Sequence, residues 1–369
     1  MTIDTRNLSP RQKIGQLFFI GISGPEIDLA IRELLDTVSP GGVCLFARNI
    51  REGEQTRLLL DHLRTILPAP PLLSLDQEGG TVDRLRRLVT PMAPAARVRN
   101  VGQAAEMARL IAEAILLLGF NMDFAPVVDV VDGVRSGSSN GLFTRPFGRT
   151  AEEAALFAGE FLRVLQEVGP TGCLKHFPGL GAAGVDSHEE LPCVDVGEDE
   201  LREVDLFPYR ELIGTGEVRA IMAAHACYPA VSLQERDRNG KLLPSSLSKN
   251  IITTLLRDEL LFDGLVITDD LEMGAIVKNY GIGEACVMAF EAGADMLSIC
   301  AAPANIREGF DVMNAAFESG RFDEERVNES LNRIEKVRLR LPEPPKFDIA
   351  RLAELSRAID EFNSRLDQN

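Results

Sequence analysis

The sequence predicts an α/β protein that folds as a single (β/α)8 barrel of the TIM type with a C-terminal helical extension. Eight short apolar runs alternate with longer amphipathic runs along the chain, as strands and helices do in such barrels. An open doubly wound sheet is the alternative. It fits less well because no GxGxxG turn follows the first run and no phosphate-binding loop is present.

The apolar runs are nearly continuous, which is typical of parallel strands covered by helices on both faces. They span residues 16–22, 42–47, 71–77, 121–129, 171–177, 220–226, 265–270 and 296–300. Between them, apolar residues recur three and four positions apart, a spacing that predicts helices with one buried face. The spacing is clearest in residues 25–38, 53–67, 104–119 and 151–169.

A proline-rich segment marks the end of the barrel. Residues 341–348 read LPEPPKFD, and residues 349–366 carry one more helical pattern. We therefore expect a catalytic barrel over residues 1–340. Residues 341–369 are predicted to form a linker and a helix that pack on the barrel or against a partner.

Composition excludes several classes of partner. The net charge of the 369 residues is −17, from 39 basic and 56 acidic side chains, whereas nucleic acids and anionic membranes require a basic surface. No run approaches the ~20 apolar residues of a membrane span, and the N-terminus lacks a signal-peptide pattern. We expect a cytoplasmic monomer or weak dimer that binds neither nucleic acid nor membrane.

The cysteines and histidines predict no metal site, because neither type clusters at ligand spacing. No CxxC motif is present, so free thiols in a reducing compartment fit best. The six cysteines are Cys44, Cys173, Cys193, Cys227, Cys286 and Cys300.

Charged side chains interrupt the apolar runs at their C-terminal ends. This edge is the active-site face of a barrel. An unpaired buried charge costs several kcal/mol, so this many charges at one rim predict a shared polar pocket. They are Asp76, Glu78, Asp129, Lys175, His176, His225, Asp269 and Asp270.

Two segments carry the candidate chemistry. Asp186 and His188 stand two residues apart beyond a loop rich in glycine and alanine. The carboxylate can hold one ring nitrogen and leave the other for substrate; the alternative is a capping Asp beside a surface His. Asp269 follows the seventh run and is expected to point inward as an ionised nucleophile, or else to pair with Lys175 or an arginine. Asp270 should point the other way, as a cap for the next helix.

At this point the residues resemble glycoside hydrolase family 3, in its single-barrel β-N-acetylglucosaminidase branch, which includes bacterial peptidoglycan-recycling enzymes. The likeness rests on motifs that occur in this order: LFARN, DQEGGxVxR, RPFG, KHFPGxG…DSH and TDDLEM. Three positions depart from the family pattern, namely Pro146, Leu180 and Thr268. They leave loop geometry and leaving-group preference open.

The resemblance implies a role for each candidate. Asp269 matches the nucleophile, and His188, held by Asp186, matches the general acid/base. The residues that match sugar-binding positions are Asp76, Arg84, Arg145, Lys175 and His176, although Arg86 or Arg87 is easily confused with Arg84. His225 and Asp129 match supporting positions. The resemblance implies no metal and no other cofactor.

The sequence thus predicts a retaining exo-β-N-acetylglucosaminidase that acts on peptidoglycan-derived fragments. Aromatic residues make up only 6% of the chain and tryptophan is absent, which favours a small pocket for one terminal sugar over a long stacking cleft. Three alternatives stay open: a β-glucosidase or β-xylosidase, a phosphorylase of the same fold, and a non-catalytic sugar-binding barrel. A phosphate-binding aldolase-type barrel is disfavoured because the eighth run is not followed by a glycine-rich loop.

Overall fold

Eight parallel strands close into a barrel in a computed structural model of the chain, which describes residues 8–133, 135, 141–184 and 191–368. The closed order is β1-β10-β9-β8-β7-β6-β3-β2, and every neighbouring pair is parallel. This confirms the predicted (β/α)8 barrel. The strands are β1 (Phe18–Gly21), β2 (Gly42–Cys44), β3 (Leu72–Leu75), β6 (Met122–Asp123), β7 (Thr171–Phe177), β8 (Ala220–Ala223), β9 (Leu265–Asp270) and β10 (Met296–Ile299).

Each strand falls within one predicted run, but the fourth run is a strand for only two of its nine residues. The run was predicted over residues 121–129, whereas β6 ends at Asp123. Pro126 lacks a backbone N–H group, so it cannot donate to a neighbouring strand. The chain nevertheless follows β7, because the Val128 N–H group donates to the Lys175 carbonyl oxygen at 2.9 Å. Asp129 therefore still lies beside the end of β7.

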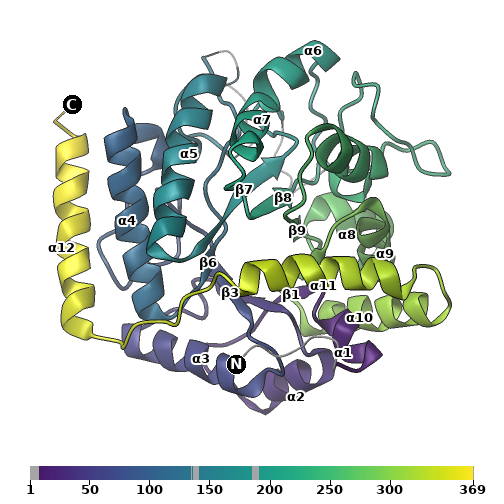
Figure 1. Cartoon of the computed structure of the whole chain (residues 1–369), viewed down its shortest axis with the longest axis horizontal. Helices are drawn as coiled ribbons and strands as arrows, with labels where there is room; N and C mark the ends of the chain where they lie inside the picture. Colours follow the sequence, from purple (N-terminus) through teal and green to yellow (C-terminus); the bar gives the residue numbers. More distant parts are fainter. Residues whose placement is uncertain (1–7, 134, 136–140, 185–190, 369) are drawn as a thin grey trace.

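The predicted helices are present and surround the barrel (Figure 1). They are α2 (Leu29–Val38), α3 (Gly53–Ile66), α4 (Val101–Leu118) and α5 (Ala151–Val168). The first begins four residues later than predicted because Asp28 caps it, its Oδ1 accepting the Ile31 N–H group at 2.8 Å.

Further helical segments complete the ring. They are α1 (Pro10–Gly15), α6 (Glu198–Glu200), the π-helical η4 (Leu201–Asp205), α7 (Phe207–Gly214), the π-helical η6 (Asn250–Glu259), α8 (Gly274–Tyr280), α9 (Ile282–Ala292), α10 (Pro303–Glu318) and α11 (Glu324–Arg338). Two short 3-10 turns are η2 (Ala95–Arg97) and η5 (Ser245–Leu247), and a small hairpin joins β4 (Gln77–Gly79) to β5 (Val82–Asp83).

The C-terminal helix α12 (Ile349–Leu366) lies along α4 at the side of the barrel (Figure 1). Its inner face is buried, including Leu355, Ile359 and Phe362. Asn363 accepts the Ala93 N–H group at 3.0 Å through its side-chain oxygen. The extension therefore packs on the barrel of its own chain, and the division of the chain at residue 340 stays a prediction.

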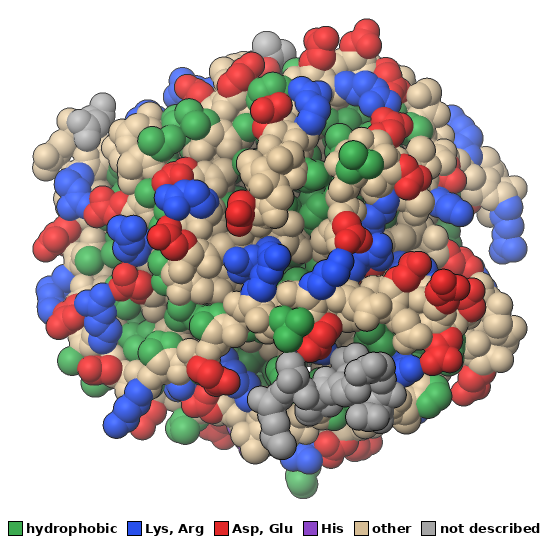
Figure 2. Space-filling model, viewed as in Figure 1, with side chains coloured by type: hydrophobic (Ala, Val, Ile, Leu, Met, Phe, Trp, Pro, Cys, Tyr) green, Lys and Arg blue, Asp and Glu red, His purple; other side chains and the backbone are tan. Residues whose placement is uncertain are grey.

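The surface carries acidic and basic side chains side by side (Figure 2). None of the described helices is both long and apolar enough to cross a bilayer. Within the same part of the chain, His, Cys, Asp and Glu side chains form no group of three that could hold a metal ion. The six cysteines are free thiols; five are buried, and Cys193 is exposed.

Candidate active site

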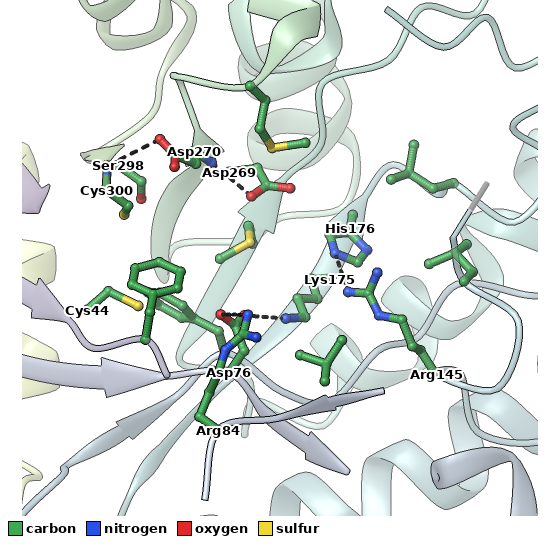
Figure 3. Close-up of a pocket in the computed structure, with 17 residues that line it drawn as sticks. Cys44, Asp76, Arg84, Arg145, Lys175, His176, Asp269, Asp270, Ser298 and Cys300 are labelled. Carbon is green, nitrogen blue, oxygen red and sulfur yellow. Dashed lines mark hydrogen bonds and ion pairs between the residues drawn. The ribbon is translucent and has the colours of Figure 1, made fainter. Parts of the chain in front are cut away.

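A cavity of about 250 Å³ opens at the C-terminal ends of the barrel strands (Figure 3). It is smaller than the ~300–1,000 Å³ of typical pockets for drug-sized ligands, so it suits one compact ligand. Its polar lining comes from segments far apart in the sequence: Asp76, Arg84, Arg145, Lys175, His176, Asp269, Asp270 and Ser298. All of the eight except Ser298 are strand-end charges or matched sugar-binding residues identified from the sequence.

Lys175 is the central cation of this cavity. Its Nζ atom lies 2.8 Å from Asp76 Oδ1 and 2.6 Å from Glu78 Oε1, and only 1% of the residue is exposed. Lys175 comes from β7, whereas both carboxylates follow β3. The ion pairs therefore join two strands that are not neighbours in the barrel, because β6 lies between them.

Two arginines extend the network to the rim. The Arg145 guanidinium binds Glu78 through two parallel bonds, from Nε at 2.8 Å and from Nη2 at 2.9 Å. Such a bidentate pair fixes the orientation of the guanidinium. Arg84 Nη2 lies 3.3 Å from Asp76 Oδ2. Among the neighbouring arginines 84, 86 and 87, Arg84 is the one that lines the cavity. Arg86 instead donates to backbone carbonyl groups.

The cations decide the ionisation of both carboxyl groups. Burial by itself raises a carboxyl pKa, but Lys175 and the arginines outweigh burial here. They lower the pKa of Glu78 to about 2 and hold the pKa of Asp76 well below its usual range. For Lys175 the signs are opposite. Burial lowers the pKa of its ammonium group, but the charges of Asp76 and Glu78 outweigh burial and raise that pKa above its ordinary value. All three groups are therefore charged near neutral pH.

His176 is held by a buried carboxylate. Its Nδ1 atom lies 2.7 Å from Asp129 Oδ2, and Asp129 Oδ1 accepts the Leu180 N–H group at 2.7 Å. With Nδ1 donating to Asp129, Nε2 faces the cavity, 3.4 Å from Arg145 Nη2. The pairing of β7 with β8 is irregular between Leu174 and Phe177, and such irregularities redirect side chains. Lys175 and His176 consequently both line the cavity although they are consecutive.

The end of β9 supplies two aspartates to the cavity wall. Figure 3 shows Asp269 across the cavity from the Lys175–Asp76 pair. Its Oδ1 accepts the N–H group of Asp270 at 2.8 Å. The ion pairs of Lys175 are with Asp76 and Glu78.

The predicted role of Asp270 as a cap of the next helix was wrong, although its carboxylate does point away from that of Asp269 (Figure 3). Asp270 also lines the cavity, and the residue preceding α8 at its N-cap is Met273. The register between β9 and β10 shifts between Met296 and Ser298, so simple alternation fails there. Asp270 Oδ1 accepts the N–H groups of Glu272 at 3.0 Å and Cys300 at 3.3 Å. Burial, reinforced by the charges of Glu272 and Asp269, raises the pKa of Asp270 to about 7.

His225 is not among the residues that line the cavity. It is fully buried, with Nδ1 2.7 Å from Ser246 Oγ and Nε2 3.1 Å from the Asp270 carbonyl oxygen. It thus contacts the backbone at the end of β9. Its supporting role stays a prediction.

Sequence reasoning assigned no role to several residues that the structure brings to the site. Glu78 was identified as a strand-end charge but given no function, although its position two residues after Asp76 is a usable signal. Cys44, Cys300, Met222 and Met273 also line the cavity. Their apolar character within or beside strands resembles that of core residues, so the sequence offers no signal for them.

Asp186 and His188 lie outside the described residues. The chain on either side of them is described, and Ala183 forms an isolated antiparallel bridge with Val194. The bridge brings the two ends of that segment together beyond the end of β7. The roles of Asp186 and His188 stay predictions.

Comparisons with known proteins agree with this geometry. The model of the glycosyl hydrolase family 3 N-terminal domain matches residues 9–337. Among curated proteins, a beta-hexosaminidase of Tolumonas auensis is 33% identical over 286 residues, and one of Pseudomonas aeruginosa is 36% identical over 285. Both alignments cover 76% of this chain and 81% of the relative.

A solved structure is similar over almost the whole chain. It is a glycoside hydrolase family 3 beta-N-acetylglucosaminidase from a Paenibacillus species, with a TM-score of 0.83 and 37% sequence identity. The match covers 96% of this chain and 69% of the other. The likeness therefore includes the barrel and the C-terminal ends of its strands.

Replacing Lys175 with methionine should strongly destabilise the fold. The substitution leaves Asp76 and Glu78 buried with fewer cations, and breaking a buried pair costs about 3–5 kcal/mol. The measurement is the midpoint of urea unfolding, followed by far-UV circular dichroism. Lys336→Met is the matched control, because Lys336 pairs with Asp263 at 2.7 Å on the surface and exposed pairs contribute at most ~1 kcal/mol. Equal losses in the two variants would contradict the assignment.

Asp270→Asn should stabilise the protein increasingly as the pH rises. The folded pKa of about 7 lies above the ordinary value of 3.8, so ionisation favours the unfolded chain. The contribution of the protonated Asp270 side chain to the free energy of unfolding is complete below about pH 4, and it is lost as the pH rises through 7. Asparagine cannot ionise, so the Tm difference between the variant and the parent should grow from pH 5 to pH 8. A pH-independent difference, like that expected for Asp360→Asn on the exposed face of α12, would refute this reasoning.

Proposed function

The chain belongs to glycosyl hydrolase family 3, and from that premise we propose that it is a retaining exo-β-N-acetylglucosaminidase. The observation that carries the proposal is the position of Asp269 on the wall of a small cavity, across from paired cations and carboxylates. The relatives are named beta-hexosaminidase and beta-N-acetylglucosaminidase, and these names support the same substrate class.

In the proposed reaction, Asp269 attacks the anomeric carbon of a terminal N-acetylglucosamine. The glycosidic bond breaks, and His188 gives a proton to the departing oxygen. A covalent glycosyl–Asp269 ester results. His188 then takes a proton from water, the water oxygen attacks the anomeric carbon, and Asp269 leaves as a carboxylate. Asp186 holds the imidazole in the tautomer that each step requires.

The remaining cavity residues bind the sugar in this proposal. An ionised Asp76 accepts hydrogen bonds from sugar hydroxyl groups, and its lowered pKa keeps it ionised. Lys175, Arg145 and Arg84 donate to oxygens of the ring substituents and of the acetamido group. His176 presents Nε2 in an orientation set by Asp129. Because these side chains are already paired with one another, they are oriented before the sugar arrives.

We further propose that the substrates are N-acetylglucosamine-containing fragments derived from peptidoglycan, cleaved in the cytoplasm by a monomer or weak dimer. The free thiols are consistent with a reducing compartment. The cavity accommodates one compact group, which favours release of a single terminal sugar. The proposed steps involve no metal and no cofactor.

Asp269→Asn should lower kcat/KM for 4-nitrophenyl N-acetyl-β-glucosaminide by roughly 10³-fold or more while N-acetylglucosamine still binds, because only the nucleophile is lost. Turnover is measured by nitrophenol release, and binding by calorimetry. The control Asp360→Asn, on the surface of α12, should leave both values unchanged. An Asp269→Asn enzyme with the parent rate would refute the mechanism.

The same assay separates the alternatives. Faster cleavage of the nitrophenyl glucoside or xyloside would instead identify a β-glucosidase or β-xylosidase. Release of a sugar phosphate in phosphate buffer would identify a phosphorylase. Sugar binding without turnover of any of these substrates would identify a non-catalytic barrel.

His188→Ala should slow the cleavage of substrates with poor leaving groups far more than that of activated ones. A nitrophenolate leaves without a proton, whereas a sugar hydroxyl leaving group needs one, and general acid catalysis contributes about 10²–10⁴-fold. The measurement compares kcat/KM for the nitrophenyl glycoside and for a disaccharide with terminal N-acetylglucosamine. Ser187→Ala, at the intervening position, is the control. Equal losses on both substrates in His188→Ala would remove the proton-transfer role.

A further inference from the structure

Two cysteine side chains outside the cavity lining contact each other. Cys193 Sγ lies 2.8 Å from Cys227 Sγ, although the two residues are 34 positions apart. Cys193 belongs to the connection between β7 and α6, and Cys227 follows β8. Both connections leave the C-terminal ends of their strands, so the contact lies on the same face of the barrel as the cavity.

The backbone holds these two residues in register. The Val194 N–H group donates to the Cys227 carbonyl oxygen at 2.8 Å, and the Cys227 N–H group donates to the Pro192 carbonyl oxygen at 2.9 Å. Together they form a parallel bridge between Cys193 and Cys227. Neighbouring strands lie about 4.8 Å apart, and disulfides span Cα separations of about 4.4–6.8 Å. A bond between the two sulfurs therefore needs only side-chain rotation.

A second thiol pair lacks this geometry and serves as an internal comparison. The Cys44 and Cys300 side chains are hydrogen-bonded. However, Cys44 ends β2, Cys300 follows β10, and β1 lies between those two strands. Two strand spacings amount to about 10 Å, beyond the ~7 Å that a disulfide can bridge. Contact between sulfurs alone therefore does not make a disulfide site.

The two sulfurs of the bridged pair differ in access. Cys193 is exposed and Cys227 is buried. Burial, together with the hydrogen bond to Cys193, raises the pKa of Cys227 to about 12. The thiolate is the reactive form of cysteine. Cys193 is consequently the thiol that meets an external disulfide first, and Cys227 is the one that completes the exchange.

We propose that Cys193 and Cys227 are a reversible dithiol–disulfide site whose oxidant is a low-molecular-weight disulfide such as oxidised glutathione. The Cys193 thiolate attacks one glutathione sulfur and releases glutathione thiolate, which leaves a mixed disulfide. The Cys227 thiolate then attacks the Cys193 sulfur and releases the second glutathione. Two protein thiols become one disulfide, and one glutathione disulfide becomes two thiols.

The bond would join the connection that follows β7 to the one that follows β8. It would close a loop of 34 positions, and such closure stabilises a fold mainly by restricting the unfolded chain. Neither cysteine lines the cavity, so the proposal does not depend on the proposed function.

The test incubates the full chain with oxidised glutathione, alkylates the remaining thiols and maps disulfides by mass spectrometry. We expect one disulfide, between Cys193 and Cys227, which dithiothreitol reverses. The oxidised protein should unfold several degrees above the reduced one. A product that stops at the mixed disulfide, a different pairing, or an unchanged Tm would overturn the proposal.

Three variants make the result specific. Cys227→Ser should accumulate the mixed disulfide on Cys193, because the second step is lost. Cys193→Ser should take up no glutathione at either position and should show no oxidant-dependent change in Tm. Cys44→Ser is the matched control from the pair separated by β1, and it should form the Cys193–Cys227 disulfide as the parent does. Loss of that disulfide in Cys44→Ser would also contradict the proposal.

Discussion

The buried charge of Lys175 is the interaction on which the site depends. A lysine at 1% exposure is tolerated only with close counter-charges, and Asp76 and Glu78 supply them from two strands away. Glu78 in turn orients Arg145, and Arg145 approaches His176. Each of these side chains is an ion-pair or hydrogen-bond partner of the next one. The cavity wall is therefore a connected network that fixes one arrangement, and its side chains do not orient independently. Its charge state persists through neutral pH because the cations hold both carboxyl pKa values low.

The barrel explains why these charges meet. Its strands are buried on both faces and accept charge only where they end, so the polar residues gather at one rim. Two local irregularities add to this arrangement. One lies in the pairing of β7 with β8 and the other in that of β9 with β10. At each of them, two consecutive residues line the cavity, where regular alternation would provide one.

The rim therefore combines two electrostatic environments. On one side, Asp76 and Glu78 are stabilised as anions by cations. On the other, Asp270 is half-buried beside Asp269 and Glu272, and its pKa is raised to about 7. Asp269, the proposed nucleophile, stands between the charged network and a carboxyl that is partly neutral near pH 7. The Cys193–Cys227 contact lies outside this cavity and is held by backbone pairing of the two connections, so the redox state of the pair and the chemistry of the site are separable.

The sequence by itself determined the barrel, because continuous apolar runs and helical spacing are local patterns that report burial directly. It also located the strand-end charges, including Lys175, His176 and Asp269. Only the tertiary structure decided their partners. The choice of Glu78 as a counter-ion shared by Lys175 and Arg145, and the place of Asp270 in the cavity wall, follow from contacts across the barrel and from shifts in strand register. The break of the fourth strand follows from the way Pro126 is accommodated beside β7. Local periodicity carries no information on such contacts, since they join residues far apart in the chain, from 30 positions for Asp270 and Cys300 to 99 for Lys175 and Asp76.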